Sequence, residues 1–135
     1  MGIIGYMVTW RTYGTWADDD EYARGKCRGM LGQRAVSLSD DERMVVLQAI
    51  EDEAAREGET MMGIAVGKQH VHLVMRTTER PVGQFVAICK TVARQALREA
   101  GFEGKVWAKG YDKRFCFSEE ELDSRIAYVV RHEAG

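Results

Sequence analysis

The sequence predicts an α+β domain of the ferredoxin-like (RRM-like) type: an antiparallel sheet with flanking helices and an added C-terminal helix. Two observations support this fold class. The order of segments is strand, helix, strand, strand, helix, strand, helix, which is a split βαβ arrangement followed by one more helix. Capping and stop signals also mark the helices. At 135 residues the chain has the usual length of one domain, so we expect a single domain over residues 1–135.

The first predicted element is a buried strand over residues 3–10, where the side chains are mostly apolar and β-favouring. Residues 11–36 show neither a helical nor an alternating period, which predicts a long excursion and, as one interpretation, a substrate loop. The aspartates at 18–20 within it are either metal ligands or part of a solvated loop, and the second interpretation is the more usual one.

The next three elements are a helix and two strands. Ser39 and Glu42 form a capping box, and Gly58 supplies a stop after apolar residues at helical spacing, namely Leu47, Ile50 and Ala54. Residues 61–66 and 70–75 are strand-like runs with a Gly-Lys-Gln connection of hairpin length between them. These signals predict a helix followed by a hairpin.

The remaining elements are a helix, an extended piece and a final helix. Pro81 can open the second helix and Gly101 can close it, with an apolar stripe formed by Phe85, Ile88, Cys89, Val92 and Ala96. An extended segment is expected over residues 106–117. A second capping box then precedes a third helix, formed by Ser118 and Glu121 and followed by Leu122, Ile126 and Val129.

The composition places limits on location and partners. The start of the chain has no basic region of the signal-peptide type and no stretch is apolar for long enough to span a bilayer, so we expect a cytoplasmic protein without a membrane partner. Cys27, Cys89 and Cys116 are widely spaced and form no CxxC pair, which predicts reduced, structural thiols. A net charge of -2 argues mildly against nucleic acid, so DNA binding would depend on local basic patches.

His70 and His72 are the first candidate functional residues. They lie two apart in an alternating segment, so both imidazoles face the same side of the strand while Val71, Leu73 and Met75 face the other. A metal site is one interpretation, and a pair of hydrogen-bonded, partly buried histidines is the other.

Tyr128 and His132 form the second candidate pair, because a spacing of four places them next to each other on the last helix. They flank the apolar stripe of that helix, an edge position from which both could face a site on the sheet. The alternative is a tyrosine packed against the core and a histidine in a frayed helix end.

Basic residues form two candidate DNA-binding patches. Lys90, Arg94 and Arg98 recur every four residues on the second helix, either as a DNA-binding stripe or as its solvated face. The segment around residues 107–114 combines cations with aromatic rings that could stack on unpaired bases: Trp107, Lys109, Tyr111, Lys113 and Arg114. The alternative there is a strand with two core aromatics.

Four blocks of the sequence resemble one protein family when taken together. These are KQHVHLVM, CKTVARQAL, VWAKGYDKRF and EEELDSRIAYVVRH, in this order, and the early segment TWRTYGTWADDDEYARG adds a fifth. The chain thus resembles the bacterial transposases of the single-tyrosine HUH class, and in particular the REP-associated tyrosine transposases. The resemblance extends over most of the chain.

The resemblance implies roles for particular residues. His70 and His72 would bind a divalent ion, and Tyr128 would attack single-stranded or hairpin DNA to leave a 5'-phosphotyrosine and a free 3'-hydroxyl. The third ligand would fall on His132, where the family usually has asparagine or glutamine. Magnesium or manganese is the family expectation, whereas three histidines favour zinc, nickel or cobalt. The Asn-Pro pair that often follows the family tyrosine is absent.

The expected function is therefore a metal-dependent single-stranded DNA endonuclease and strand transferase, acting in transposition or in domesticated genome processing. A degenerate relative that binds hairpin DNA or RNA without cutting it is the first alternative. A small metal-binding or regulatory protein of the same fold without a nucleic-acid partner is the second. The resemblance is compatible with a monomer or a homodimer, with Tyr128 acting in its own subunit or in the other one.

Overall fold

The computed structural model describes residues 2–15 and 33–133, and the side chains of residues 132 and 133 lie outside that description. Its elements run in the predicted order: β1 (Gly5–Arg11), α2 (Asp40–Glu57), β2 (Met61–Val66), β3 (His70–Arg76), α3 (Val82–Glu99), β4 (Asp112–Cys116) and α4 (Glu119–Glu133). None of the helices in these described ranges combines the length and the apolar character needed to cross a bilayer. The aspartates at 18–20 and Cys27 lie outside the described residues.

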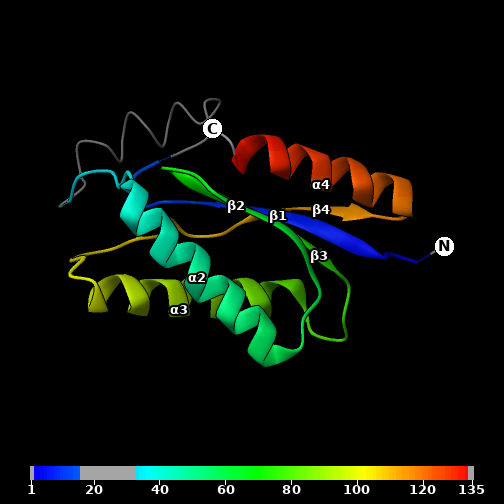
Figure 1. The fold of residues 1–135 in the computed structure, drawn as a ribbon, viewed down its shortest axis with the longest axis horizontal. Helices are drawn as coiled ribbons and strands as arrows, with labels where there is room; N and C mark the ends of the chain where they lie inside the picture. The colour runs from blue at the N-terminus through cyan, green and yellow to red at the C-terminus, as the bar shows by residue number, and fades with distance from the viewer. Residues whose placement is uncertain (1, 16–32, 134–135) are drawn as a thin grey trace.

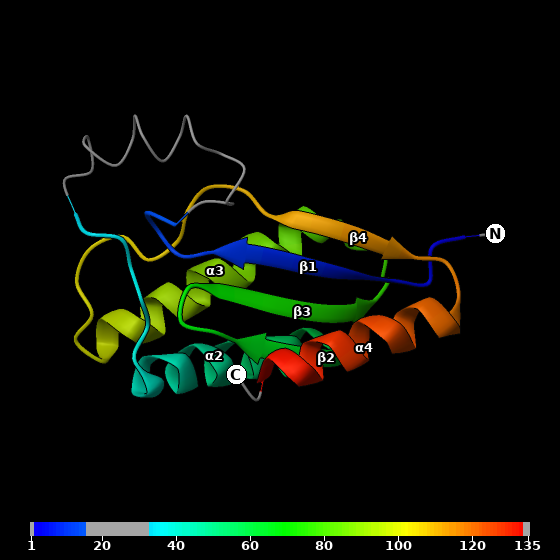
Figure 2. The same ribbon diagram turned by 90° about the horizontal axis from the view of Figure 1, so that it is seen from above.

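The four strands form one antiparallel sheet in the order β2-β3-β1-β4. Helices α2 and α3 cover one face of this sheet and α4 covers the other (Figures 1 and 2). The predicted ferredoxin-like fold with an added C-terminal helix is therefore confirmed. The two central strands, β3 and β1, carry the residues that matter most for the site described below.

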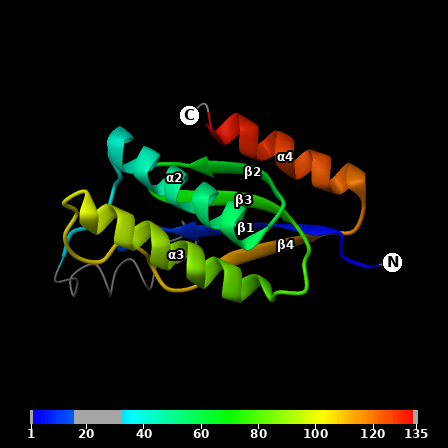
Figure 3. The same ribbon diagram turned by 60° about the horizontal axis from the view of Figure 1, so that its bottom comes forward.

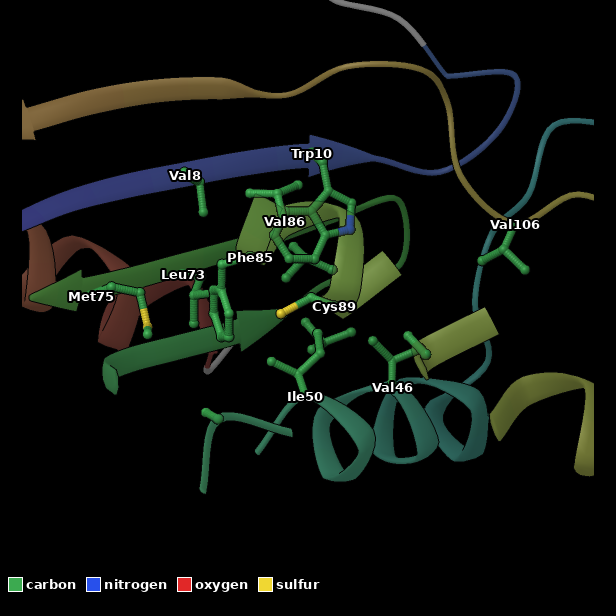
Figure 4. Close-up of a cluster of buried hydrophobic side chains, with 14 of the residues drawn as sticks. Val8, Trp10, Val46, Ile50, Leu73, Met75, Phe85, Val86, Cys89 and Val106 are labelled. Atoms are coloured by element: carbon green, nitrogen blue, oxygen red, sulfur yellow. The ribbon is translucent and has the colours of Figure 1, made fainter. Parts of the chain in front are cut away.

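The larger core lies between the sheet and the α2–α3 layer. Alternate residues of the central strands point into it, because successive side chains of a strand face opposite sides. Figure 4 shows Val8 and Trp10 of β1 and Leu73 of β3 meeting Phe85 and Ile50 from the two helices. Val8, Ile50 and Leu73 are fully buried. This core fixes which face of β3 is left for the histidines.

A smaller core holds α4 against the opposite face of the sheet. Leu122 and Val129 of the helix pack on a buried apolar set from the strands that consists of Met7, Ala65, Val74 and Cys116. The helix approaches closely at Gly5, where an added Cβ would lie 2.8 Å from Leu122 Cδ1 and 2.7 Å from the backbone oxygen of Met75. A larger residue at Gly5 would therefore press on the backbone of β3 and require the side chain of Leu122 to shift.

The buried face of α3 differs from the predicted stripe. Phe85 and Cys89 are buried as expected, but the other fully buried positions are Val86, Ala93 and Leu97. Ile88, Val92 and Ala96 are only half-buried. The reason is that α3 packs beside α2 as well as on the sheet (Figure 3). Its buried side chains face both neighbours, so the buried stripe is rotated from the one predicted for a helix that contacts the sheet alone.

The extended segment predicted over residues 106–117 is also shorter than expected. Strand β4 starts only at Asp112, and Trp107 makes a single bridge to Thr12. The carbonyl oxygens of Ala108 and Gly110 accept hydrogen bonds from Lys90 Nζ, at 3.1 and 2.7 Å, instead of pairing in the sheet. The connection before β4 is thus fastened to α3.

Candidate functional site

His70 and His72 lie on the α4 face of β3, as the alternation of the strand predicts. Their ring centroids are 4.5 Å apart with an interplanar angle of 59°. His72 is buried, with 6% of its surface exposed, whereas His70 is half-buried near the β2–β3 hairpin. An added Cβ at Gly67 would lie 3.3 Å from His70 Nε2, so the absence of a side chain there gives this imidazole room. The strand and hairpin thus place two imidazoles side by side.

Thr9 of β1 holds the ring of His72. The two residues are Cα partners in the antiparallel pair of β1 and β3, and Thr9 Oγ1 lies 2.8 Å from His72 Nδ1. A hydroxyl can either donate to this nitrogen or accept from it. When the hydroxyl accepts a hydrogen bond from Nδ1–H, the neutral ring keeps its lone pair on Nε2, and this is the form that binds a metal. This hydrogen bond can therefore set both the tautomer and the orientation of His72.

Tyr128 of α4 lies beside the histidine pair. Its ring meets that of His72 edge-on, with centroids 5.4 Å apart and an interplanar angle of 81°. The residue is half-buried next to Val129, at the edge of the helix face that packs on the sheet. The nucleophile candidate and both histidines are thus brought together within one chain.

His132 belongs to α4, one turn after Tyr128, but its side chain lies outside the described residues. Its predicted role as a third metal ligand therefore stays a prediction. Among the side chains that the structure describes, no group of three or more His, Cys, Asp or Glu residues is placed to hold a metal ion. Two neighbouring imidazoles are a donor set that suits zinc and the later divalent transition metals. His70 and His72 therefore fit a divalent ion as part of its ligand set.

A cleft of about 1220 Å³ opens beside this site. His72 and Tyr128 line it on the α4 side, and its lining continues past β4 to α3 on the other side of the sheet. The described lining carries seven cationic side chains, Arg11, Lys90, Arg94, Arg98, Lys105, Lys109 and Arg114, and one carboxylate, Asp112. The chain as a whole has a net charge of -2, so positive charge is concentrated in the cleft. A polyanion is the ligand class that such a surface attracts.

Most of the residues predicted to bind DNA line this cleft: Arg94, Trp107, Lys109, Tyr111 and Arg114. Lys113 does not. It pairs with Val8 in the register of β1 and β4, and its Nζ lies 5.2 Å from the ring centroid of Phe115 on the same strand. Lys113 therefore lies on the α3 face of β4, opposite to Arg114, and it is not among the described residues that line the cleft.

Lys90 also lines the cleft, but its ammonium group has a structural role. It donates to the carbonyl oxygens of Ala108 and Gly110, and burial lowers its pKa. In return Trp107 Nε1 donates to the backbone oxygen of Lys90 at 3.0 Å. These three hydrogen bonds fasten the connection before β4 to α3. Lys90 supports the cleft wall instead of presenting a solvated charge.

Sequence reasoning did not single out several lining residues on β1 and in the neighbouring loops. Arg11 follows Thr9 by two positions and therefore shares its face of the sheet. Tyr13 has Lys105 Nζ 5.3 Å from its ring centroid, a cation–π contact. The polar Thr9 within the otherwise apolar run of residues 3–10 was the one sequence signal that pointed to this surface. The position of Lys105 depends on tertiary contacts that no local pattern reveals.

Comparison with known proteins finds similar folds among solved structures. No protein-family model matches the chain, and no curated protein matches it in sequence. A solved structure of a REP-associated tyrosine transposase bound to a REP hairpin is similar with a TM-score of 0.64 and 9% identity, over 98% of this chain and 70% of that one. A candidate transposase from Deinococcus radiodurans R1 is similar with a TM-score of 0.54 and 19% identity, over 100% of this chain and 95% of that one.

At these identities the likeness establishes a shared fold. The chain has the ferredoxin-like architecture found in these transposase structures, which agrees with the family resemblance seen in the sequence.

Proposed function

We propose that this chain is a metal-dependent endonuclease and strand transferase for single-stranded DNA, with Tyr128 as the nucleophile. The observation that carries this proposal is the contact between the Tyr128 ring and His72, at 5.4 Å between centroids, beside a second histidine and at the wall of a basic cleft. Because Tyr128 contacts the histidine of its own chain, one subunit holds the nucleophile and both imidazoles. This supports a site completed without a second subunit.

The histidines would hold the divalent ion, with His132 as the proposed third ligand. When bound, such an ion polarises a phosphate and offsets the charge that develops on it. The contribution of the chain itself is positioning. Thr9 orients His72 through its hydrogen bond, and the packing of Leu122 in the smaller core fixes α4, which carries Tyr128.

The covalent step involves one bond formed and one broken. The phenol oxygen of Tyr128 bonds to phosphorus, and the bond from phosphorus to the 3'-oxygen of the preceding nucleotide breaks. A phenol is mostly protonated near neutral pH, so its proton passes to a base or to water while the leaving oxygen takes one up. The products are a 5'-phosphotyrosine and a free 3'-hydroxyl. Attack by another 3'-hydroxyl on the phosphotyrosine reverses the step and transfers the strand.

The cleft is suited to a nucleic-acid strand. Lys109 and Arg114 offer charge to phosphates, and the rings of Trp107 and Tyr111 offer surfaces on which unpaired bases can stack. That a protein of the same fold is described as bound to a REP hairpin supports DNA as the partner. We propose transposition or a related genome-processing reaction as the setting.

A covalent-trapping experiment tests the proposal. The purified chain is incubated with a divalent metal and single-stranded DNA from its own genomic neighbourhood, labelled at the 3' end so that the label stays on the piece joined to Tyr128, and the products are separated under denaturing conditions. We expect a labelled protein band that requires metal. Nicked DNA without an adduct would point to hydrolysis by water, and unaltered DNA in every metal tested would contradict the proposal.

A protein that binds hairpin DNA or RNA without cutting it is the second candidate. The observation that favours it is the concentration of cations in the cleft, which can bind a nucleic-acid backbone without a metal. A gel shift without any nicking, across several divalent metals, would select this candidate.

A further inference from the structure

The cleft extends beyond the residues that the proposed reaction uses. Tyr128 and His72 line its α4 side, but Arg94 and Arg98 line it from α3, which covers the other face of the sheet (Figure 2). The segment from residue 105 to residue 111 joins the two sides past the start of β4. A ligand that filled the whole cleft would therefore pass the edge of the sheet.

The basic stripe of α3 divides into one hydrogen-bonded residue and two exposed residues. Lys90 is half-buried and donates to the carbonyl oxygens of Ala108 and Gly110. Arg94 and Arg98 follow at intervals of four on the same helix face and are exposed at the cleft. Stripe residues that only solvate a helix would not line a cleft together with aromatic rings and a further lysine.

We infer that Arg94, Arg98 and Lys105 form a second phosphate-binding subsite, here called the α3 subsite. It binds the backbone of the same single strand, several nucleotides away from the phosphate at Tyr128. The identity of the ligand as DNA rests on the proposed function. The subsite itself rests on the charge and the continuity of the cleft.

Three physical features favour an extended polyanion as the occupant. A volume of about 1220 Å³ exceeds the roughly 300–1,000 Å³ of ordinary small-molecule pockets. Arg94 and Arg98 are separated by about 6 Å along the helix axis, as four residues of an α-helix are, so they can reach successive phosphates. Guanidinium groups also bind phosphate oxygens in bidentate fashion.

The path between the two subsites is lined by rings. Trp107 is fixed by its hydrogen bond to Lys90 and by an edge-on contact with Trp10, with centroids 6.1 Å apart. Tyr111 is 37% exposed and lines the same cleft. Bases stacked on such rings would carry the strand from Tyr128 towards α3 without a requirement for a particular sequence.

The test measures how affinity depends on the length of the DNA. Oligothymidines of about 4 to about 16 nucleotides, the range of site sizes seen for single-strand binding folds, are titrated without metal. The proteins are the wild type, the double variant Arg94→Ala with Arg98→Ala, and the matched control Lys113→Ala. Arg94 and Arg98 are exposed, so their replacement leaves the fold intact.

We expect the affinity of the wild type and of the Lys113 control to rise with length to a common plateau. The double variant should match them on the shortest oligothymidines and reach its plateau at a shorter length. On the longest oligothymidine its slope of log affinity against log salt should be less steep by about 1.4, since each phosphate contact with a single strand contributes about 0.7.

Two results would overturn the inference: an equal loss at every length, which indicates a general charge effect, or no loss at any length. The α3 subsite and the proposed nuclease function can fail independently of each other. Length-dependent binding without any covalent adduct would keep the α3 subsite and reject the nuclease, and an adduct without this length dependence would do the opposite.

Discussion

Replacing Thr9 by valine tests whether its hydroxyl orients His72. The two side chains have nearly the same volume, so the main change is the loss of the hydrogen bond at 2.8 Å to Nδ1. Because His72 is only 6% exposed, water cannot readily replace this partner. A buried polar group that loses its partner costs about 1–3 kcal/mol, so we expect a measurable fall in the free energy of unfolding.

The same substitution should also weaken metal binding. Partners that orient a metal-binding histidine typically change metal affinity by about 10- to 100-fold when removed, which is about 1.4–2.8 kcal/mol. Isothermal titration of the purified chain with Mn²⁺ and with Zn²⁺ measures this directly. Thr9→Ser is the matched control, because it keeps a hydroxyl at the same position and should retain most of the affinity.

Either of two results would show that the Thr9 hydroxyl does not orient His72 for metal binding. Wild-type metal affinity in Thr9→Val, together with a lower free energy of unfolding, would show that the hydrogen bond only stabilises the sheet. An equal loss of affinity in Thr9→Ser would show that the methyl group matters and the hydroxyl does not.

Three further predictions follow from local geometry. Gly67→Ala places a Cβ 3.3 Å from His70 Nε2, so the imidazole must move by a few tenths of an ångström; calorimetry should show weaker metal binding with little change in Tm, and unchanged binding would argue against His70 as a ligand. Gly5→Ala places a Cβ 2.7 Å from the backbone oxygen of Met75 in β3, which cannot give way without disturbing the pairing of β1 with β3; we expect a loss of about 1–3 kcal/mol in urea unfolding, and a wild-type midpoint would contradict this close approach. Burial raises the pKa of the Cys89 thiol from 9.0 to about 12, so its contribution to stability is complete below pH 9 and is lost as the pH rises towards 12. Over this range the free energy of unfolding should fall more steeply in wild type than in Cys89→Ala, by up to about 1.4 kcal/mol per pH unit. Parallel pH profiles for the two proteins would exclude this linkage.

The order and type of the elements could be predicted because the signals are local. Ser39 and Glu42 make the capping box that starts α2, and Gly58 ends it with a left-handed conformation. The alternation in β3 likewise predicted that His70 and His72 share a face. The buried sector of α3 could not be predicted in the same way, because it depends on the neighbouring α2 and not on the periodicity of α3 alone.

The surroundings of the candidate site were less accessible to sequence reasoning. Thr9 and His72 are 63 residues apart, so their hydrogen bond depends on the register of β1 with β3. Lys90 and Arg94 look equivalent in the helical repeat, yet one supports a loop and the other faces the cleft. Lys113 lies one position before Arg114, and the alternation of β4 sends it to the other face. Tertiary register and strand direction decide these roles.

Covalent trapping with two phenylalanine variants decides which side chain is the nucleophile. Tyr128→Phe removes only the hydroxyl that would be esterified, so folding, metal binding and DNA binding should stay close to wild type. Tyr111→Phe is the matched control, because Tyr111 also lines the cleft and its hydroxyl is the alternative nucleophile to be excluded. We expect metal-dependent protein–DNA adducts to form with wild type and Tyr111→Phe and to be absent with Tyr128→Phe. An adduct that forms at the normal rate with Tyr128→Phe would contradict it.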